Sequence, residues 1–341
     1  MSRRNPNCRP AGATQETFGC VVDEVTPVPY LLVACGDLLI PGRDLVVRKI
    51  IGWVLLGLGA FLLVTGLLTT VWAPGQVERT PLDTDSVTRL SGNADKLNPA
   101  TGDLEAIDVK ATSITKADSK RSDDDVIVFV NTLCLVIDEG DVPDCVDGDD
   151  DRLVTASEDV FSTDRYTAEA VNGKYLPAGA EEKEGLVNKW PFNAEKKDYD
   201  YWDGLLGAPV TAAYDGTETL DGLETYKYHV VLDTTPAEVI DGVQGTYSQD
   251  KTIWIEPRTG AIVNQSQHEV RALDTGDTIL DLNLAFTEEQ VADNIESSKD
   301  NKSQLDLVTG TLPLVGFIGG AIALLAGAFL VFVGRKDEKT A

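Results

Sequence analysis

The chain has 341 residues and carries 29 Lys and Arg against 56 Asp and Glu, a formal net charge of −27 at pH 7. Such an acidic chain is a poor partner for nucleic acid, whereas it concentrates small cations around itself. It contains no phosphate-binding glycine loop, nucleophile elbow or Cys–His arrangement, so we expect neither an enzyme nor a bound cofactor or metal.

Residues 1–45 show no amphipathic period, and their three cysteines, Cys8, Cys20 and Cys35, lack obvious partners. Proteins of this kind usually begin with basic residues directly before a membrane span. We therefore expect this segment to be either a disordered leader or the product of a mis-called start upstream of Val46.

Two apolar stretches, residues 50–72 and 312–334, each contain 23 residues without a charge. A helix of that length reaches ~34 Å, enough to cross a hydrocarbon core of ~30 Å. The first stretch is too long for the apolar part of a cleaved signal peptide, and no cleavage site follows it. We therefore predict membrane helices over residues 46–72 and 312–334.

Basic residues flank both spans on their outer sides, at Arg48 and Lys49 before the first and at Arg335 and Lys336 after the second. The positive-inside rule then places both termini, including the basic tail 335–341, in the cytoplasm. Residues 73–311 are expected to form an extracytoplasmic domain of an integral cell-envelope protein.

Small residues recur along one face of the second span, at Gly316, Gly320, Ala323 and Gly327. In the first span, glycines recur every seven residues. Such faces allow helices to pack closely, so we expect the hairpin to pack on itself or to form a homo-oligomer. A pore made of these helices would be lined by glycine, backbone and a few threonines, because neither span contains an ionisable residue.

The domain between the spans holds 20 basic and 49 acidic residues, a net charge of −29. Its most acidic stretch contains Asp138, Glu139, Asp141, Asp144, Asp147, Asp149, Asp150 and Asp151. We predict that these carboxylates attract cations, although solubility alone also explains the charge. The spacing does not supply the alternating ligands of a calcium loop, so a solvated acidic loop is favoured over a calcium site.

Cys134 and Cys145 are the only cysteines between the spans, and a Gly and a Pro lie between them. Outside the cytoplasm an isolated pair at this spacing predicts a disulfide. A metal site is the lesser alternative, because two thiols rarely suffice.

The rest of the domain shows mainly strand patterns. Residues 73–120 are expected to be a linker passing into weak strands, and the apolar run 126–137 predicts one or two buried strands. The aromatic groups within 189–192 and 197–203 are expected to anchor an irregular loop, and a platform for a carbohydrate or a lipid is the lesser alternative. Strands are predicted at 225–233, 252–256, 261–265, 268–273 and 278–286, followed by a polar helix or stalk at 288–307.

The expected fold is therefore a membrane protein of the α+β class, with two transmembrane helices flanking a large, mainly antiparallel β domain. The succession RKIIGW, KWPF, YWD, DGLETYKY and TIWIEPRTGAIVN, ending in a span with a short basic tail, resembles the actinobacterial PorA family over residues 47–337. That resemblance implies a channel-forming porin of the cell envelope that favours cations.

We therefore predict an oligomeric, water-filled pore with an acidic mouth, in contact with membrane lipid. The alternative is a membrane-anchored binding or scaffold module whose β domain holds a lipid, a glycan or an envelope protein. Such a module predicts an apolar cavity among the strands, near Trp190, Tyr201, Trp202 and Trp254.

Overall fold

The computed structural model describes residues 43–240 and 242–333. Its helices are α1 (Arg43–Val71), α2 (Pro74–Val77), α3 (Glu288–Asp306) and α4 (Leu312–Val333), with a π-helical turn at Leu307–Thr311. Positions 1–42 of the leader predicted over residues 1–45 lie outside the described residues. The predicted tail 335–341 also lies outside them.

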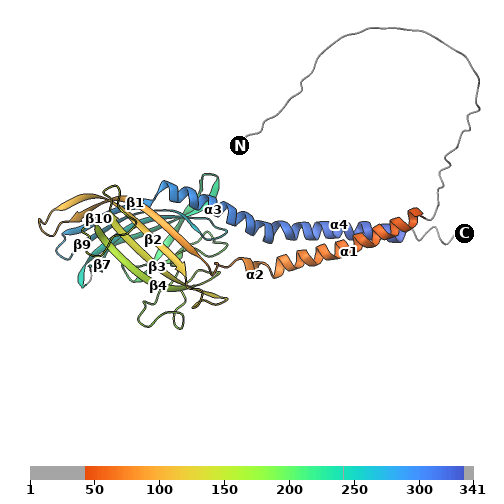
Figure 1. Cartoon of the computed structure of the whole chain (residues 1–341), viewed down its shortest axis with the longest axis horizontal. Helices are drawn as coiled ribbons and strands as arrows, with labels where there is room; N and C mark the ends of the chain where they lie inside the picture. The colour runs from red at the N-terminus through yellow and green to blue at the C-terminus, as the bar shows by residue number, and fades with distance from the viewer. Residues whose placement is uncertain (1–42, 241, 334–341) are drawn as a thin grey trace, which may run out of the picture. The chain divides into compact units, whose positions relative to one another are not determined.

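Ten strands form one antiparallel sheet (Figure 1), which confirms the antiparallel β domain that the sequence predicts. The strands are β1 (Asp85–Leu97), β2 (Leu104–Ala117), β3 (Val126–Ile137), β4 (Leu153–Asp164), β5 (Tyr199–Asp203), β6 (Ala208–Leu220), β7 (Leu223–Ile240), β8 (Val243–Ile255), β9 (Ile262–Leu273) and β10 (Thr278–Phe286). Their order across the sheet is β4-β3-β2-β1-β10-β9-β8-β7-β6-β5. The last strand therefore returns to pair with the first.

The sheet curves into a half-barrel (Figure 1) whose edge strands are β4 and β5. Short pieces of the β4–β5 connection bridge these edges: Thr163 pairs with Ala170, Glu169 with Leu186, and Leu186 with Tyr201 in β5. Both edges are thus covered over part of their length, which limits pairing with other chains.

Several strands differ from the sequence-based expectation. The weak strands expected after the linker within residues 73–120 are two long strands, because β1 and β2 pair with each other along almost their whole length. The aromatic group at 199–203 is strand β5 and not part of an irregular loop. Strands β4 and β6 went unrecognised because their exposed faces are rich in Thr, Ser and acidic residues, which hides the apolar alternation.

Strand β3 accounts for the continuous apolar run 126–137, because both of its faces are covered. Ile127 and Phe129 face a core cluster on one side, and Val136 packs with Val142 of the following loop on the other. A strand covered on both faces loses the alternation that normally identifies it.

Helix α3 follows β10 directly and occupies the segment expected to be a polar helix or stalk. Thr287 caps it, since the Thr287 hydroxyl accepts a hydrogen bond from the Gln290 N–H at 3.1 Å. Ile295 of α3 packs against Leu223 and Val263 of the sheet. The π-helical turn then joins α3 to α4 in one continuous helical run.

Helices α1 and α4 lie side by side (Figure 1), and glycines form their contact. The facing pairs are Gly52 with Gly327, Gly59 with Gly320, and Gly66 with Gly316. A Cβ placed on Gly59 would lie 2.9 Å from the Gly320 carbonyl oxygen, and one on Gly316 would lie 2.8 Å from the Gly66 Cα. The small face of α4, including the buried Ala323, is therefore used within the chain, against α1.

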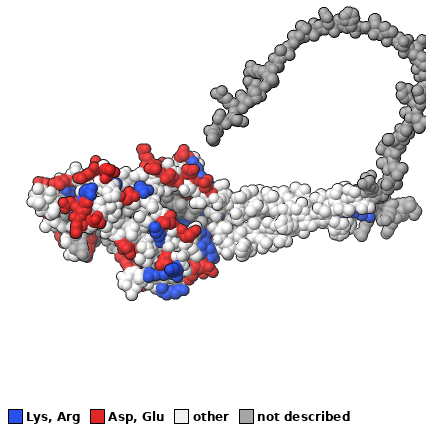
Figure 2. Space-filling model, viewed as in Figure 1, with Lys and Arg blue, Asp and Glu red and all other residues white. Residues whose placement is uncertain are grey.

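Both helices are long and apolar enough to cross a membrane. Large apolar side chains such as Trp53, Phe61, Leu325 and Phe329 are exposed around the pair, and Figure 2 shows it free of charged side chains over most of its length. A helix that is apolar all round suits a lipid environment. These features fit a two-span membrane protein, and insertion itself stays a prediction.

Candidate functional site

The β4–β5 connection, residues 165–198, divides the concave face of the half-barrel into two halves. In one, called here the filled half (the concave face of β5–β8), Trp190 is fully buried. Its ring lies 5.5 Å from that of Tyr201 and 5.0 Å from that of Tyr228, measured between centroids. Ile253 and Ile255 of β8 complete this cluster. The cavity expected beside Trp190 and Tyr201 is therefore wrong in its placement, because these rings pack against each other.

The other half, called here the hollow half (the concave face of β1–β4, β9 and β10), encloses an inner cavity of about 360 Å³. Alternate residues of six adjacent strands line it, and so do Val187 and Asn188 of the connection. The apolar part of the wall consists of Leu90, Ala111, Leu133, Leu135, Phe161, Leu282, Leu284 and Phe286. Regular alternation thus places a whole sheet face around one space.

An outer cavity of about 650 Å³ adjoins the inner one, since Thr88, Thr115, Asn188 and Phe286 line both. Its further apolar lining includes Val77, Pro81, Phe129, Phe192, Ile262, Leu305 and Val308, and its amides come from Asn294, Asn301 and Gln304. Val77 ends α2, which follows α1, and Val308 lies in the π-helical turn before α4. The outer cavity therefore borders both connections to the apolar helices.

The outer cavity carries positive charge in an otherwise acidic domain. Arg79 and Lys189 are the charged residues among its lining, which includes no carboxylate. Arg79 is compensated by Asp125 at 3.3 Å. The Lys189 ammonium instead donates to the Thr80 hydroxyl at 3.2 Å and lies 3.9 Å from the centre of the Phe192 ring.

In the part of the chain that the structure describes, no carboxylate forms an ion pair with Lys189, and the buried Oδ1 of Asn188 receives no hydrogen bond. Loss of hydration lowers the pKa of Lys189 to about 7. The outer cavity is therefore lined by a cation that has no carboxylate partner among the described residues. This is the chemistry of a site for an anion.

Charges at the inner cavity, by contrast, are balanced. The almost fully buried Lys183 lies 3.1 Å from Asp159 and 3.0 Å from Glu181. Glu269 accepts from Arg271 at 2.6 Å. The inner cavity consequently combines an apolar side from β1, β3 and β10 with a polar side from β9, and its charges are paired locally.

Arg258, in the turn between β8 and β9, ties both helix connections to the sheet. Its guanidinium lies 2.8 Å from Glu78, which follows α2, and 2.6 Å from the Thr309 hydroxyl in the π-helical turn. It also reaches Asn193 and Asp306. Because the Arg258 and Glu78 side chains are only 17% and 9% exposed, this pair is less screened by solvent than a surface ion pair.

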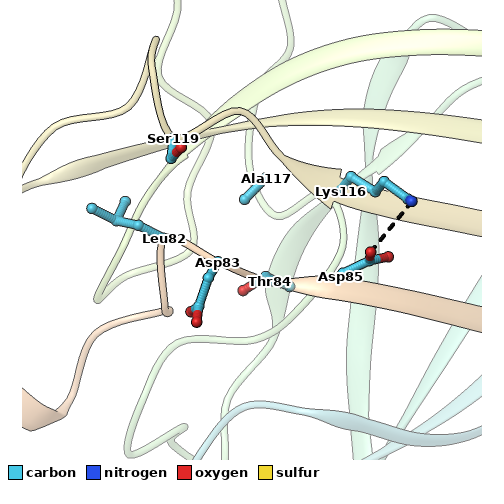
Figure 3. A pocket seen from close by; sticks show the side chains of 7 residues that line it. All are labelled: Leu82, Asp83, Thr84, Asp85, Lys116, Ala117 and Ser119. Carbon is cyan, nitrogen blue, oxygen red and sulfur yellow. Dashed lines mark ion pairs between the residues drawn. The ribbon is translucent and has the colours of Figure 1, made fainter.

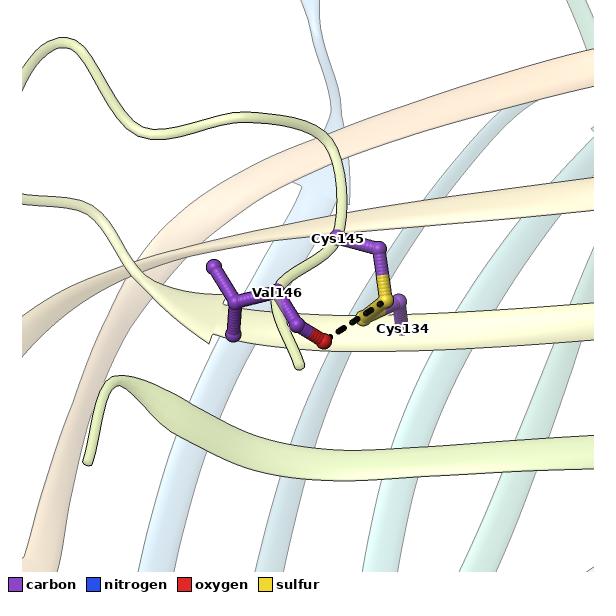
Figure 4. Close-up of a disulfide and its surroundings, with 3 residues drawn as sticks. All are labelled: Cys134, Cys145 and Val146. Atoms are coloured by element: carbon purple, nitrogen blue, oxygen red, sulfur yellow. Dashed lines mark hydrogen bonds between the residues drawn. A yellow bond between two sulfur atoms is a disulfide. The ribbon is translucent and has the colours of Figure 1, made fainter. Parts of the chain in front are cut away.

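The predicted acidic stretch forms the loop between β3 and β4. The structure contains the disulfide between Cys134 of β3 and Cys145 of this loop (Figure 4). Cys134 alternates with Leu133 and Leu135, whose side chains line the inner cavity. The loop is therefore fixed to the face of β3 opposite the cavities, and none of its eight carboxylates lines either of them.

Two of the eight loop carboxylates are compensated locally. Asp144 pairs with Arg89 at 3.0 Å, and Asp150 pairs with Arg152 at 2.5 Å. Hydrogen bonds from Arg152 lower the pKa of Asp150 to about 2. The other six form no ion pair in the described residues, where no group of three His, Cys, Asp or Glu is placed to hold a metal ion. Figure 2 shows that acidic side chains gather over the β-sheet region.

A further hollow, of about 370 Å³, lies where β1 begins and β2 ends (Figure 3). Its charged groups include Lys116 and Asp85, which pair at 3.3 Å and are both more than half exposed. With this ion pair satisfied and open to solvent, the hollow offers little chemistry of its own.

Sequence reasoning missed Asn188 and Lys189, which stand beside Trp190 in a segment interpreted only as an aromatic anchor. The available signal was a Lys between Asn and Trp, in a segment of the acidic domain where aromatic side chains gather. Nothing in the local pattern shows that six distant strands enclose a space beside it.

Comparison with protein families gives one match. A family model described as Porin PorA covers residues 51–329, from the start of the first apolar helix to near the end of the second. No curated protein matches the chain.

Proposed function

The chain belongs to the porin PorA family, and from this premise we propose that it acts as a porin-like channel of the cell envelope that favours cations. The family match over most of the chain carries the proposal. The pair of apolar helices supports it, because such helices can anchor the β domain in a membrane. In this proposal both termini are cytoplasmic and the protein has no catalytic role.

A single copy leaves no passage between α1 and α4, because their glycines are in direct contact. The threonine hydroxyls that would line a helical pore donate to their own helix, as Thr65 does to the Phe61 carbonyl at 3.0 Å and Thr70 to that of Gly66 at 2.7 Å. We therefore propose that several copies assemble around the water-filled passage.

Cation preference would come from the surface of the β domain. The six uncompensated carboxylates of the acidic loop lie on the outside of the half-barrel, where they raise the local concentration of cations near a shared mouth. They act at a distance in this scheme, since they line neither cavity.

The test is conductance of the purified full chain in a planar bilayer with asymmetric salt. We expect discrete steps and a reversal potential on the cation side. Changing the uncompensated Asp147, Asp149 and Asp151 to Asn should move that potential toward zero. The comparison variant changes Asp144 and Asp150, which pair with arginines, to Asn. It removes two negative charges instead of three, so the potential should move by a smaller amount. A silent bilayer from folded, oligomeric protein would overturn the channel proposal.

A second candidate function, a membrane-anchored binding module, is favoured by one specific observation. The hollow half encloses adjoining cavities of about 650 and 360 Å³ beside the helix connections. Together they reach the upper end of the size range of small-molecule sites, ~300–1,000 Å³. The apolar helices would then serve as anchors.

A further inference from the structure

We propose that the hollow half binds one membrane phospholipid, with its anionic headgroup in the outer cavity and an acyl chain in the inner cavity. The proposal rests on the second candidate function and deepens it, and it is independent of whether the protein conducts ions. Three features of the described residues carry it: the division of charge between the cavities, the apolar side of the inner cavity, and the location of the outer one.

The charged residues that line the outer cavity indicate which kind of lipid headgroup would bind there. The region between the spans carries a net charge of −29, yet the lining of the outer cavity combines Arg79 and Lys189 with no carboxylate. Among the described residues, the contacts of the Lys189 ammonium are with the Thr80 hydroxyl and the Phe192 ring, and no carboxylate pairs with it. A phosphate or carboxylate group would supply the missing counter-charge.

The leucines of the inner cavity indicate where an acyl chain of the lipid would bind. Leucines from β1, β3 and β10 form one side of its wall, and the polar side chains of β9 form another. Glu269 pairs with Arg271 there, and Asp159 pairs with Lys183, which lies outside the lining. An apolar chain gains by leaving water for the leucine side of this wall, whereas a second charged group would find no free partner there. The four lining residues that the cavities share allow one molecule to occupy both.

The position of the outer cavity beside the two helix connections indicates that the lipid would come from the membrane. Val77 follows the first apolar helix and Val308 precedes the second, and both side chains line the outer cavity. If these helices span a bilayer, the outer cavity lies where the chain leaves the lipid. A phospholipid of the same leaflet can then reach the site without crossing a long stretch of water.

The experiment is native mass spectrometry of the detergent-purified full chain, incubated with phosphatidylglycerol or with phosphatidylcholine of the same acyl chains. We expect saturable binding of one phosphatidylglycerol, about tenfold tighter than phosphatidylcholine. Both lipids offer a phosphate to Lys189, but choline also brings a cation beside Lys189 and Arg79, and one charge contact is worth about that factor. Lys189→Met should weaken the binding of phosphatidylglycerol more than that of phosphatidylcholine and so reduce this preference. Lys116→Met, in an exposed ion pair outside both cavities, is the matched control and should bind like the natural chain.

A second variant, Ala111→Trp, fills the inner cavity and should reduce binding of both lipids, with folding checked by circular dichroism. Equal binding of both lipids by the natural chain, or an unchanged preference in Lys189→Met, would overturn the headgroup assignment. Binding of oleate without binding of phosphatidylglycerol would overturn the phospholipid assignment. Loss of conductance with lipid binding intact would count against the channel alone.

Discussion

The filled and hollow halves of the half-barrel are built from one sheet with one alternation, yet they differ in what covers their concave faces. In the filled half, Trp190 and its two tyrosine neighbours occupy the space above β7 and β8. In the hollow half, Leu90, Leu282 and Leu284 belong to a smaller buried cluster, and the remaining inward side chains, mostly polar, leave about 1,000 Å³ in two adjoining cavities.

Empty space weakens a protein, because the atoms around it lose contacts on one side. A domain selected for stability alone would fill both halves in the same way. The difference is what the proposed lipid site requires, and the following experiments test whether the two halves behave as differently as they are packed.

The largest effect should come from emptying the filled half. Trp190→Ala removes a fully buried ring that contacts Tyr201 and Tyr228, and it should cost about 3–5 kcal/mol of unfolding free energy. The measurement is thermal and denaturant unfolding in detergent. The control is Trp254→Ala, a partly buried tryptophan whose indole donates to Glu218 at 2.8 Å, which should cost less. Equal losses in the two variants would contradict a packed filled half.

The second-largest loss of stability should come from removing the disulfide, which holds the acidic loop on the face of β3 opposite the cavities. Changing both Cys134 and Cys145 to Ser should cost about 2–3 kcal/mol, since the bridge closes a short loop. Proteolysis of the loop at 138–151 should become faster, while the region around Trp190 keeps its protection. An unchanged cleavage rate would show that Val142 and its neighbours hold the loop without the bridge.

A matched pair of substitutions compares the halves directly. Ala212 in β6 is fully buried in the filled half, and Ala111 in β2 lines the inner cavity. Changing Ala212 to Leu should cost about 1–3 kcal/mol through overpacking. The same change at Ala111 should cost less, because Ala111 is buried but borders the inner cavity, into which the added atoms can extend. Equal costs, measured by the same unfolding assay, would mean that the hollow half has no usable room.

The sequence predicts much of this fold and little of its site. Local sequence patterns predict the two apolar helices, the antiparallel sheet and the helix after β10, because each of these elements has a recognisable pattern within a short segment. Strands β1, β2, β4 and β6 are longer or more regular than their polar sequences suggest, since pairing with long neighbours compensates for weak propensity.

The cavities depend on which strands become neighbours. Leu90 and Leu284, nearly two hundred positions apart, line the same space because β10 returns to pair with β1. The predicted acidic stretch is an exposed loop, but only the topology shows that it lies on the opposite face from the cavities. Whether the space around Trp190 is a packed core or a cavity depends on the volumes of the side chains that surround it. No local sequence pattern shows which side chains these are.

The smallest effect, and the one closest to the proposed site, is a dependence of stability on pH. The pKa of Lys189 is about 7 in the folded chain, against an ordinary value of 10.5. Between these values the unfolded chain binds the proton and the folded chain does not, so stability rises with pH across this window. The slope is at most about 1.4 kcal/mol per pH unit.

Lys189→Met should abolish this slope and leave the protein more stable at pH 7, whereas Lys116→Met should preserve it; both variants retain Arg79, the other charged group of the outer cavity. Thermal midpoints between pH 7 and 10 provide the measurement. An anionic lipid beside Lys189 favours its protonated form, so added phosphatidylglycerol should flatten the slope in the natural chain only. If the stability of Lys189→Met still rises with pH in this range, groups other than Lys189 titrate there. That result would contradict an unpaired, buried Lys189 in the hollow half.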